Sequence, residues 1–90
     1  QYMLTVSENC FPLIDSVTLD QAATFFVNPF TACGLTNIAI KEKRGGIVQT
    51  AAASALGKMI QRYAKRKGLP VINVVRRDDQ VELLLKEGAE

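Results

Sequence analysis

The chain has 90 residues, of which 48% are hydrophobic and 22% are charged, and its formal net charge is +2. A chain of this length forms at most one small domain, and so small a net charge gives no argument for binding nucleic acid or an anionic membrane. Because the sequence has no histidine, it lacks the usual general base near neutral pH and the commonest metal ligand.

The two cysteines, Cys10 and Cys33, lie far apart and form no C-x-x-C pair. We therefore expect neither a metal site nor a redox motif, and we expect a reduced, cytoplasmic chain. No stretch approaches the roughly 20 apolar residues that span a bilayer. The first residue is Gln1 rather than Met, and the last residues directly follow a helical pattern. We expect the chain to be a piece of a longer protein.

In the first part of the chain, alternating apolar residues predict a short strand over residues 1–6, and polar residues with a proline predict a loop over residues 8–17. Thr18 and Gln21 fit a capping box, in which each side chain binds the backbone N–H of the other. This pair predicts the start of a short helix over residues 19–26.

The pair Asn28 and Pro29 then predicts both the end of that helix and the start of the next. Proline removes a backbone donor but fits the first position of a helix, and asparagine is a favoured N-cap. We expect a second helix over residues 29–43, terminated by Gly45 and Gly46.

The second half of the chain predicts a strand, a helix, a strand and a helix in turn. Apolar and β-branched runs predict strands over residues 47–51 and 71–75, the latter buried on both faces. Helical periodicity predicts helices over residues 55–67 and 81–87, with Gly68 capping the first. Because a helix joins the two strands, we expect an α/β fold with a parallel pair.

Small residues gather where the first of these strands meets its helix. The dinucleotide fingerprint G-x-G-x-x-G needs a residue for the tight turn, one for close approach to the pyrophosphate, and one for helix packing. Ala52, Ser54 and Gly57 occupy these three positions. The turn is therefore either a phosphate site at the positive end of a helix, with Ser54 as a hydroxyl donor or cap, or an ordinary connection.

Two arginines follow the second strand. An acid at this point binds the ribose 2′-hydroxyl of NAD, whereas an arginine accommodates the 2′-phosphate of NADP. Arg76 and Arg77 therefore favour a phosphate role, and the other interpretation is a solvated basic loop. We expect Asp78 or Asp79 to cap the next helix, although Asp78 facing the ribose would favour NAD.

Four stretches, in this order and spacing, resemble the medium-chain dehydrogenase/reductase superfamily, and in particular its zinc-independent NADPH:quinone oxidoreductases and 2-enoyl thioester reductases. They are VNPFTACGL (27–35), TAAASALGKM (50–59), INVVRRDD (72–79) and KEGAE (86–90). The resemblance implies a partial Rossmann fold, a parallel β-α-β-α unit preceded by linking helices from a GroES-like catalytic domain. It places the tail of that catalytic domain at residues 1–17, the linking helices at 18–46, and the first part of the NADP-binding Rossmann domain at 47–90.

The resemblance also implies a set of cofactor-binding residues and no metal site. It places Ser54, Ala55, Leu56 and Gly57 at the pyrophosphate, Arg76 and Arg77 at the 2′-phosphate, and Asn28 and Thr31 near the nicotinamide end. Helix capping remains the other interpretation of Asn28. The implied chemistry is hydride transfer from NADPH to a quinone, an α,β-unsaturated carbonyl or an enoyl thioester.

The resemblance further implies a small-molecule substrate and a homodimeric whole protein. No residue of these 90 is a credible catalytic acid or base, so we expect the piece alone to be inactive. Two other interpretations remain: an anion-binding module that uses the basic helix over residues 58–67 with the two arginines, and a structural scaffold. The NADP interpretation requires Ser54 and Arg76 at one edge of the sheet.

Overall fold

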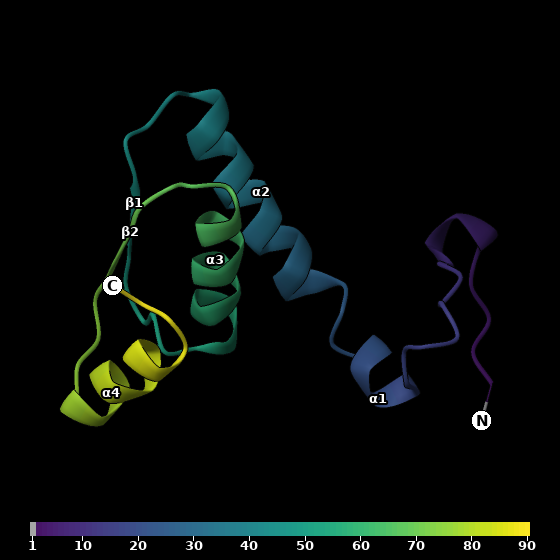
Figure 1. Cartoon of the computed structure of the whole chain (residues 1–90). Helices are drawn as coiled ribbons and strands as arrows, with labels where there is room; N and C mark the ends of the chain where they lie inside the picture. Colours follow the sequence, from purple (N-terminus) through teal and green to yellow (C-terminus); the bar gives the residue numbers. More distant parts are fainter. Residues whose placement is uncertain (1) are drawn as a thin grey trace.

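The structure is a computed structural model that describes residues 2–90. Its elements, in chain order, are η1 (Ser7–Asn9), α1 (Leu19–Ala22), α2 (Val27–Lys41), β1 (Ile47–Gln49), α3 (Ala55–Arg66), β2 (Val71–Asn73) and α4 (Asp78–Lys86). Figure 1 shows the two strands beside α3, with α2 crossing behind and α1 extending away from the sheet. Within the described range, every helix is too short or too polar to cross a membrane.

The two strands form a parallel pair joined by α3, as the sequence predicts. Ile47 pairs with Val71 and Gln49 pairs with Asn73, so the carboxyl ends of both strands lie at the same edge. The predicted α/β fold with a parallel β-α-β-α unit is therefore confirmed.

Only one face of this small sheet is covered. The outward residues Val48 and Ile72 are 68% and 64% exposed, whereas Gln49 on the opposite face is buried beneath α3. The prediction that residues 71–75 are buried on both faces is therefore wrong. Among residues 2–90, helices pack on one side of the strands only, and the β-branched residues of the other side meet no partner.

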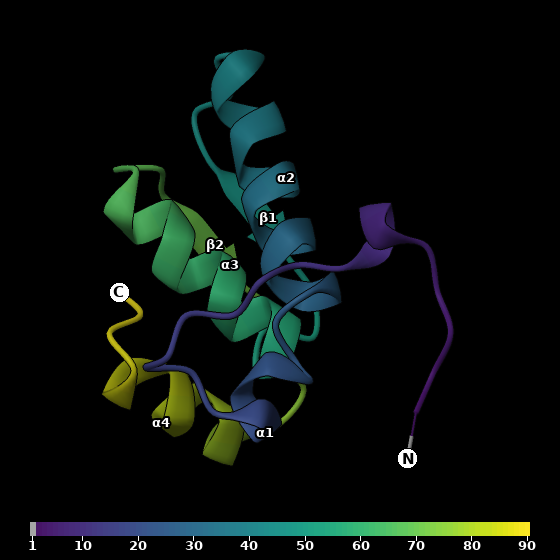
Figure 2. The ribbon, with the colours of Figure 1, turned by 90° about the vertical axis from the view of Figure 1, so that its right-hand side faces the viewer.

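The core lies mainly between α2 and α3, which cross at close range (Figure 2). Its buried residues are small on both helices: Ala32 and Thr36 of α2, and Ala64 of α3 with the larger Ile60. Small side chains let two helix backbones approach closely, so this contact fixes α3 on the sheet at one side and on α2 at the other.

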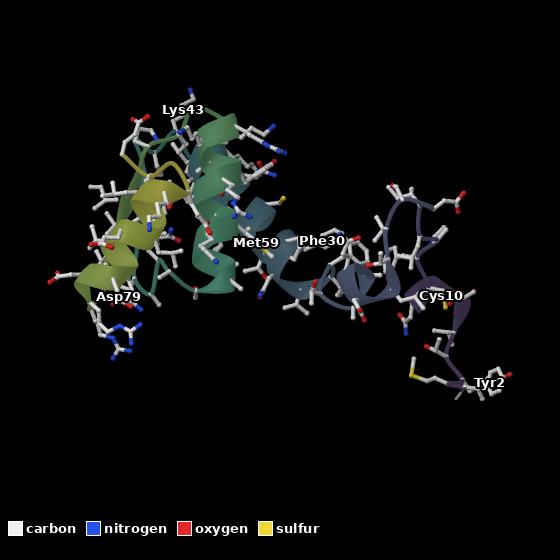
Figure 3. The ribbon with its side chains drawn as sticks, turned by 60° about the horizontal axis from the view of Figure 1, so that its bottom comes forward. Tyr2, Cys10, Phe30, Lys43, Met59 and Asp79 are labelled. Carbon is white, nitrogen blue, oxygen red and sulfur yellow. The ribbon has the colours of Figure 1, made fainter. Side chains whose placement is uncertain are left out.

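Residues 2–6 form no strand, contrary to the prediction for residues 1–6, of which Gln1 lies outside the described residues. A strand needs a hydrogen-bonding neighbour, and no described segment pairs with this one. Tyr2 and Leu4 are fully exposed, and Figure 3 shows Tyr2 far from Met59 of α3. Alternation alone therefore gave the wrong structure.

The predicted capping box at α1 is present. The Thr18 N–H donates to Gln21 Oε1 at 3.0 Å, and the Gln21 N–H donates to Thr18 Oγ1 at 3.3 Å. The helix itself ends at Ala22, earlier than the predicted residue 26, and continues as turns.

The start of α2 differs from the prediction. The helix begins at Val27 with Phe26 as its N-cap, so Asn28 is a helical residue and not the cap. Pro29 is the third helical residue, a position in the first turn where a missing N–H removes no intrahelical bond. The restriction that proline places on its preceding residue did not exclude Asn28 from the helix.

The end of α2 is set by Lys43 rather than by the glycine pair. Lys43 has φ of 56°, its N–H donates to Ile40 O at 3.0 Å, and the Arg44 N–H donates to Ala39 O at 2.9 Å. This is a Schellman motif with a lysine in the left-handed position that usually holds glycine. The prediction that Gly45 and Gly46 terminate this helix is wrong, whereas Gly68, with φ of 70°, ends α3 in the predicted way.

We expect Lys43→Gly to stabilise the protein, because a residue with a Cβ is strained at positive φ and glycine is not. The gain should be about 0.5–1 kcal/mol in the free energy of unfolding, measured by urea denaturation of the full-length protein. Lys43→Ala is the matched control: it removes the charge but keeps the Cβ, and should give no such gain. Equal stabilisation by both variants would show that charge, not backbone strain, is responsible.

Candidate functional site

A hollow of about 530 Å³ lies beyond the carboxyl ends of both strands. We call it the strand-end hollow; it is lined by Thr50, Ala51, Ala53, Ser54, Val74, Val75, Arg76 and Gln80. Ligands of open α/β sheets bind in the crevice outside the carboxyl ends of the strands. The structure therefore brings Ser54 and Arg76, which are distant in the sequence, to the same edge of the sheet and the same hollow.

Ser54, which directly precedes α3, is one of the residues that line this hollow. It is the N-cap, with φ −70° and ψ 165°, and its Oγ accepts the Gly57 N–H at 3.1 Å. The hydroxyl hydrogen remains available to a ligand. The N–H groups of Ala55 and Leu56 lie in the first turn, where helix geometry offers them no acceptor, at the positive end of the helix dipole. This arrangement suits an anion.

Gly57 lies against the strand-to-helix turn. A Cβ at this position would come within 2.5 Å of the carbonyl oxygen of Ala52, and Ala52 is itself completely buried. The packing role that the sequence predicts for the third small residue is confirmed. Only glycine allows α3 to start this close to the end of β1.

The tight turn after β1 includes Ala52: the Ser54 N–H donates to the Ala51 carbonyl at 2.9 Å, so Ala52 and Ala53 are the central residues of the turn. Ala51 has φ of 51° and lines the strand-end hollow, whereas Ala52 packs beneath the helix. Ala52 therefore lies in the tight turn, as predicted, and the left-handed residue directly precedes it. A left-handed conformation at an alanine costs of the order of 1 kcal/mol.

The two arginines after β2 have different surroundings. Arg76 lines the hollow, and its backbone N–H donates to Gln80 Oε1 at 3.2 Å. The Arg77 guanidinium binds Asp79 through two hydrogen bonds of 3.0 and 3.1 Å, outside the lining. Asp78 and Asp79 lie in the first turn of α4 and make no side-chain cap, so the predicted aspartate cap is wrong. Their negative charges still interact favourably with the positive end of the α4 dipole.

Asn28 and Thr31 do not reach the strand-end hollow. Both lie near the start of α2, and neither is among the lining residues. The Thr31 hydroxyl donates to the Val27 carbonyl at 2.8 Å, so its proton is used within the helix. The structure thus separates these two residues from Ser54 and Arg76.

Three basic side chains of α3, those of Lys58, Arg62 and Lys65, bind the residues that directly follow α4. Glu87 lies 3.4 Å from the Lys58 ammonium and 3.0 Å from the Arg62 guanidinium. The Lys65 ammonium donates to the Gly88 carbonyl at 3.0 Å. Because these cations already bind the chain itself, the interpretation of α3 as a surface for an anionic partner loses support.

Sequence reasoning missed three amide side chains beneath the turn, which we call the amide chain (Gln49, Asn73 and Gln61). Gln49 Nε2 donates to the Gly57 carbonyl at 3.0 Å and to Asn73 Oδ1 at 2.6 Å. Asn73 Nδ2 donates to Gln61 Oε1 at 3.2 Å. The available signal was that each apolar strand ends in a polar residue, Gln49 or Asn73.

Over residues 2–90, no cluster of three or more His, Cys, Asp or Glu could hold a metal ion.

Comparison with known proteins places this chain beside two kinds of reductase. It is 40% identical over 78 residues to a mitochondrial enoyl-[acyl-carrier-protein] reductase of Caenorhabditis elegans, covering 86% of this chain and 23% of that protein. It is 36% identical over 84 residues to an NADPH quinone oxidoreductase of Kluyveromyces marxianus, covering 90% of this chain and 22% of that protein. No family model matches the chain.

The fold matches a solved structure as well. A crystal structure of a protein named NADPH:quinone reductase, from Mesorhizobium loti, superimposes with a TM-score of 0.80 and 42% identity, covering 89% of this chain and 23% of that one. The fold and the hollow define a parallel β-α-β unit of the dinucleotide-binding type. The resemblance to the zinc-independent branch of the medium-chain dehydrogenase/reductase superfamily is confirmed. The chain spans less than a quarter of the length of each of these relatives.

We expect Gly57→Ala to destabilise the protein by about 1–3 kcal/mol, because the new methyl group would meet a backbone carbonyl that cannot rotate away. Thermal or urea denaturation of the full-length protein measures the change. Gly34→Ala is the matched control: Gly34 also lies within a helix, but a Cβ there meets nothing within 4 Å. This second variant should gain up to about 1 kcal/mol from helix propensity. A neutral Gly57→Ala would contradict the close approach.

Proposed function

We propose that this chain forms the phosphate-binding part of an NADPH site in a zinc-independent reductase. The whole protein would transfer hydride to a quinone or to an α,β-unsaturated carbonyl or enoyl thioester. The observation that supports this most strongly is the meeting of Ser54 and Arg76 at the strand-end hollow. The names of the relatives support the choice of cofactor and of acceptor class.

In this proposal the first turn of α3 binds the pyrophosphate. Ser54 offers its hydroxyl, and Ala55 and Leu56 offer backbone N–H groups at the positive end of the helix. Gly57 contributes by bringing the helix against the strand end, so that no side chain stands between the backbone and the phosphate. The residues present therefore fit a pyrophosphate group.

Arg76 would bind the 2′-phosphate. A guanidinium binds phosphate through two parallel hydrogen bonds and also stacks on a purine, and no described acid forms an ion pair with Arg76. Arg77 would contribute only if its guanidinium left Asp79, so we propose it as the secondary of the two.

The reaction itself would rely on the bound cofactor, which supplies the hydride, while the chain binds and orients it. We propose Asn28 and Thr31 for the nicotinamide end of the cleft. The lining of the strand-end hollow contains no carboxylate, so any proton donor to the substrate would lie elsewhere in the full-length protein. This piece alone would not catalyse the reaction.

The remaining assignments are parts of the same proposal. Residues 1–17 would be the tail of a catalytic domain, 18–46 linking helices, and 47–90 the start of the Rossmann domain. The full-length protein would act on a small molecule as a homodimer, which sedimentation would test. We also propose a cytoplasmic location. The nematode relative is named as mitochondrial, so imaging of a tagged full-length protein would test which compartment is correct.

We expect Arg76→Ala to weaken NADPH binding by the full-length protein about 10- to 100-fold, which is the loss of affinity expected when a hydrogen bond between charged groups is removed. NADH binding should hardly change, because NADH lacks the 2′-phosphate. Titration calorimetry with both cofactors measures this. Arg77→Ala is the matched control and should cost less than about threefold, because its guanidinium already binds Asp79. Unchanged NADPH affinity in both variants would show that the site assignment is wrong.

We expect the full-length protein to consume NADPH in the presence of a 2-enoyl thioester or a quinone, and to prefer NADPH over NADH. The two acceptors, tested separately at equal concentration, would identify the substrate class. The loss of NADPH absorbance gives the rate, and a reaction mixture without acceptor is the blank. If NADPH binds but neither acceptor is reduced, the proposed reaction is wrong while the cofactor site stands.

A further inference from the structure

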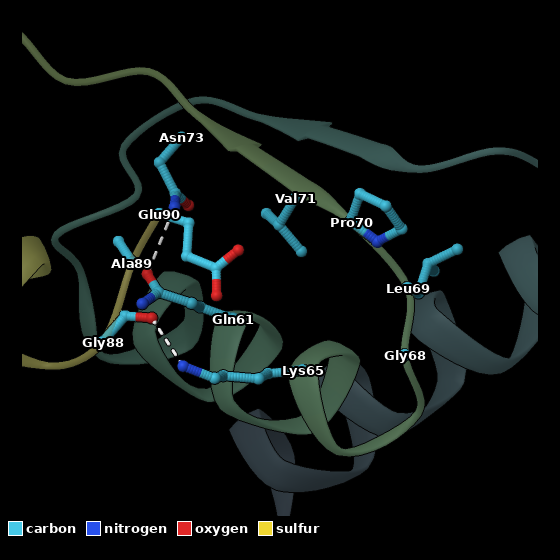
Figure 4. Close-up of a pocket in the computed structure, with 10 residues that line it drawn as sticks. All are labelled: Gln61, Lys65, Gly68, Leu69, Pro70, Val71, Asn73, Gly88, Ala89 and Glu90. Atoms are coloured by element: carbon cyan, nitrogen blue, oxygen red, sulfur yellow. Dashed lines mark hydrogen bonds between the residues drawn. The ribbon is translucent and has the colours of Figure 1, made fainter.

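The amide chain lies on the covered face of the sheet and links three elements. Gln49 ends β1, Asn73 ends β2 opposite it in the register, and Gln61 lies in the middle of α3. Gln49 and Gln61 are 8% and 6% exposed. Figure 4 shows the outer end of the chain, where Asn73 and Gln61 meet at a second hollow beside Val71 and Lys65. The hydrogen bonds of the amide chain connect both strands to α3, and Gln49 Oε1 is buried with no hydrogen-bond partner among the described residues.

The Gly57 carbonyl sets the direction of the whole chain. A carbonyl oxygen only accepts hydrogen bonds, so the atom of Gln49 that faces it must be the amide nitrogen. That nitrogen also faces Asn73, which fixes the Asn73 oxygen on this side and its nitrogen toward Gln61. One backbone group on α3 thus determines the orientation of three side chains.

Gly57 is consequently held from three sides. Its N–H donates to Ser54 Oγ at 3.1 Å, its carbonyl accepts from Gln49 at 3.0 Å, and its Cα lies against the Ala52 carbonyl. Gly57 is the third residue of α3, so these contacts fix the first turn. The N–H groups of that turn are the ones directed at the pyrophosphate in the proposed site.

We propose that Gln49 is a positioning residue for the pyrophosphate turn, acting through the Gly57 carbonyl. Gln49 itself does not line the strand-end hollow. Without its donor, the buried Gly57 carbonyl loses its side-chain partner, and the first turn of α3 is no longer held at the angle that directs its N–H groups into the hollow. This inference rests on the proposed function and adds a residue to it.

The test compares two ligands in Gln49→Met, which keeps the length of the side chain and removes the donor. NADP⁺ needs the pyrophosphate turn and the 2′-phosphate site together. Adenosine 2′-monophosphate (2′-AMP) has the 2′-phosphate but no pyrophosphate, so it reports on the surroundings of Arg76 alone. In the full-length protein, NADP⁺ should bind about five- to tenfold more weakly, whereas the dissociation constant of 2′-AMP should stay within about twofold.

Gln61→Met is the matched control. It removes an equally buried amide from the other end of the amide chain, but one that makes no side-chain hydrogen bond to Gly57. A purely structural role predicts the same fall in melting temperature and the same effect on ligands for both variants. The positioning role predicts that Gln61→Met lowers the melting temperature similarly while leaving NADP⁺ binding within about twofold of the unchanged protein.

The outcomes separate this inference from the proposed function. If the unchanged protein binds NADP⁺ but Gln49→Met loses NADP⁺ and 2′-AMP equally, or no more NADP⁺ than Gln61→Met does, the positioning role is overturned and the site stands. If the unchanged protein does not bind NADP⁺, the proposed function is wrong and the inference is overturned with it. Selective loss of NADP⁺ in Gln49→Met supports both.

Discussion

The contact between Gly57 and the Ala52 carbonyl is the constraint on which the rest of the structure depends. It brings the first turn of α3 directly onto the end of β1, at a distance that leaves no space for a side chain. Because β1 and β2 are parallel and in register, the same contact places this turn beside the end of β2. This close approach therefore places the start of α3 at the strand-end hollow, which Arg76 lines from the end of β2.

The distribution of charge reinforces this geometry. Lys58, Arg62 and Lys65 of α3 bind Glu87 and the Gly88 carbonyl, which connects the end of α4 to α3. Arg77 is likewise neutralised by Asp79. Arg76 thus remains as the cation at the strand ends, next to the positive end of a helix. Two positive features of different origin, one a side chain and one a backbone dipole, therefore act on the same volume.

The sequence predicted the features that local chemistry determines. Thr18 and Gln21 form their capping box, Gly68 ends α3, and the apolar runs give a parallel pair. Predictions failed where a neighbour decides the structure. Residues 2–6 alternate but have no described strand to pair with, and Ile72 is β-branched on a face that no described helix covers.

The candidate site was predictable in part for the same reason. Ser54 and Arg76 could be placed at one edge, because parallel strands and a small-residue turn require it. The left-handed residues Lys43 and Ala51 could not be found, because nothing in their side chains favours positive φ. The role of Gln49 was hidden as well, since a glutamine at a strand end is unremarkable until the carbonyl that it binds is known.

The nature of the atom opposite Gly57 has a genetic consequence. Most steric conflicts in a protein core can be relieved by a second substitution that shrinks the neighbouring side chain. Here the opposing atom belongs to the main chain of Ala52, which every amino acid possesses. Compensating changes at the neighbour are therefore ruled out, and a larger residue at position 57 can be tolerated only if the helix itself shifts away from the strand.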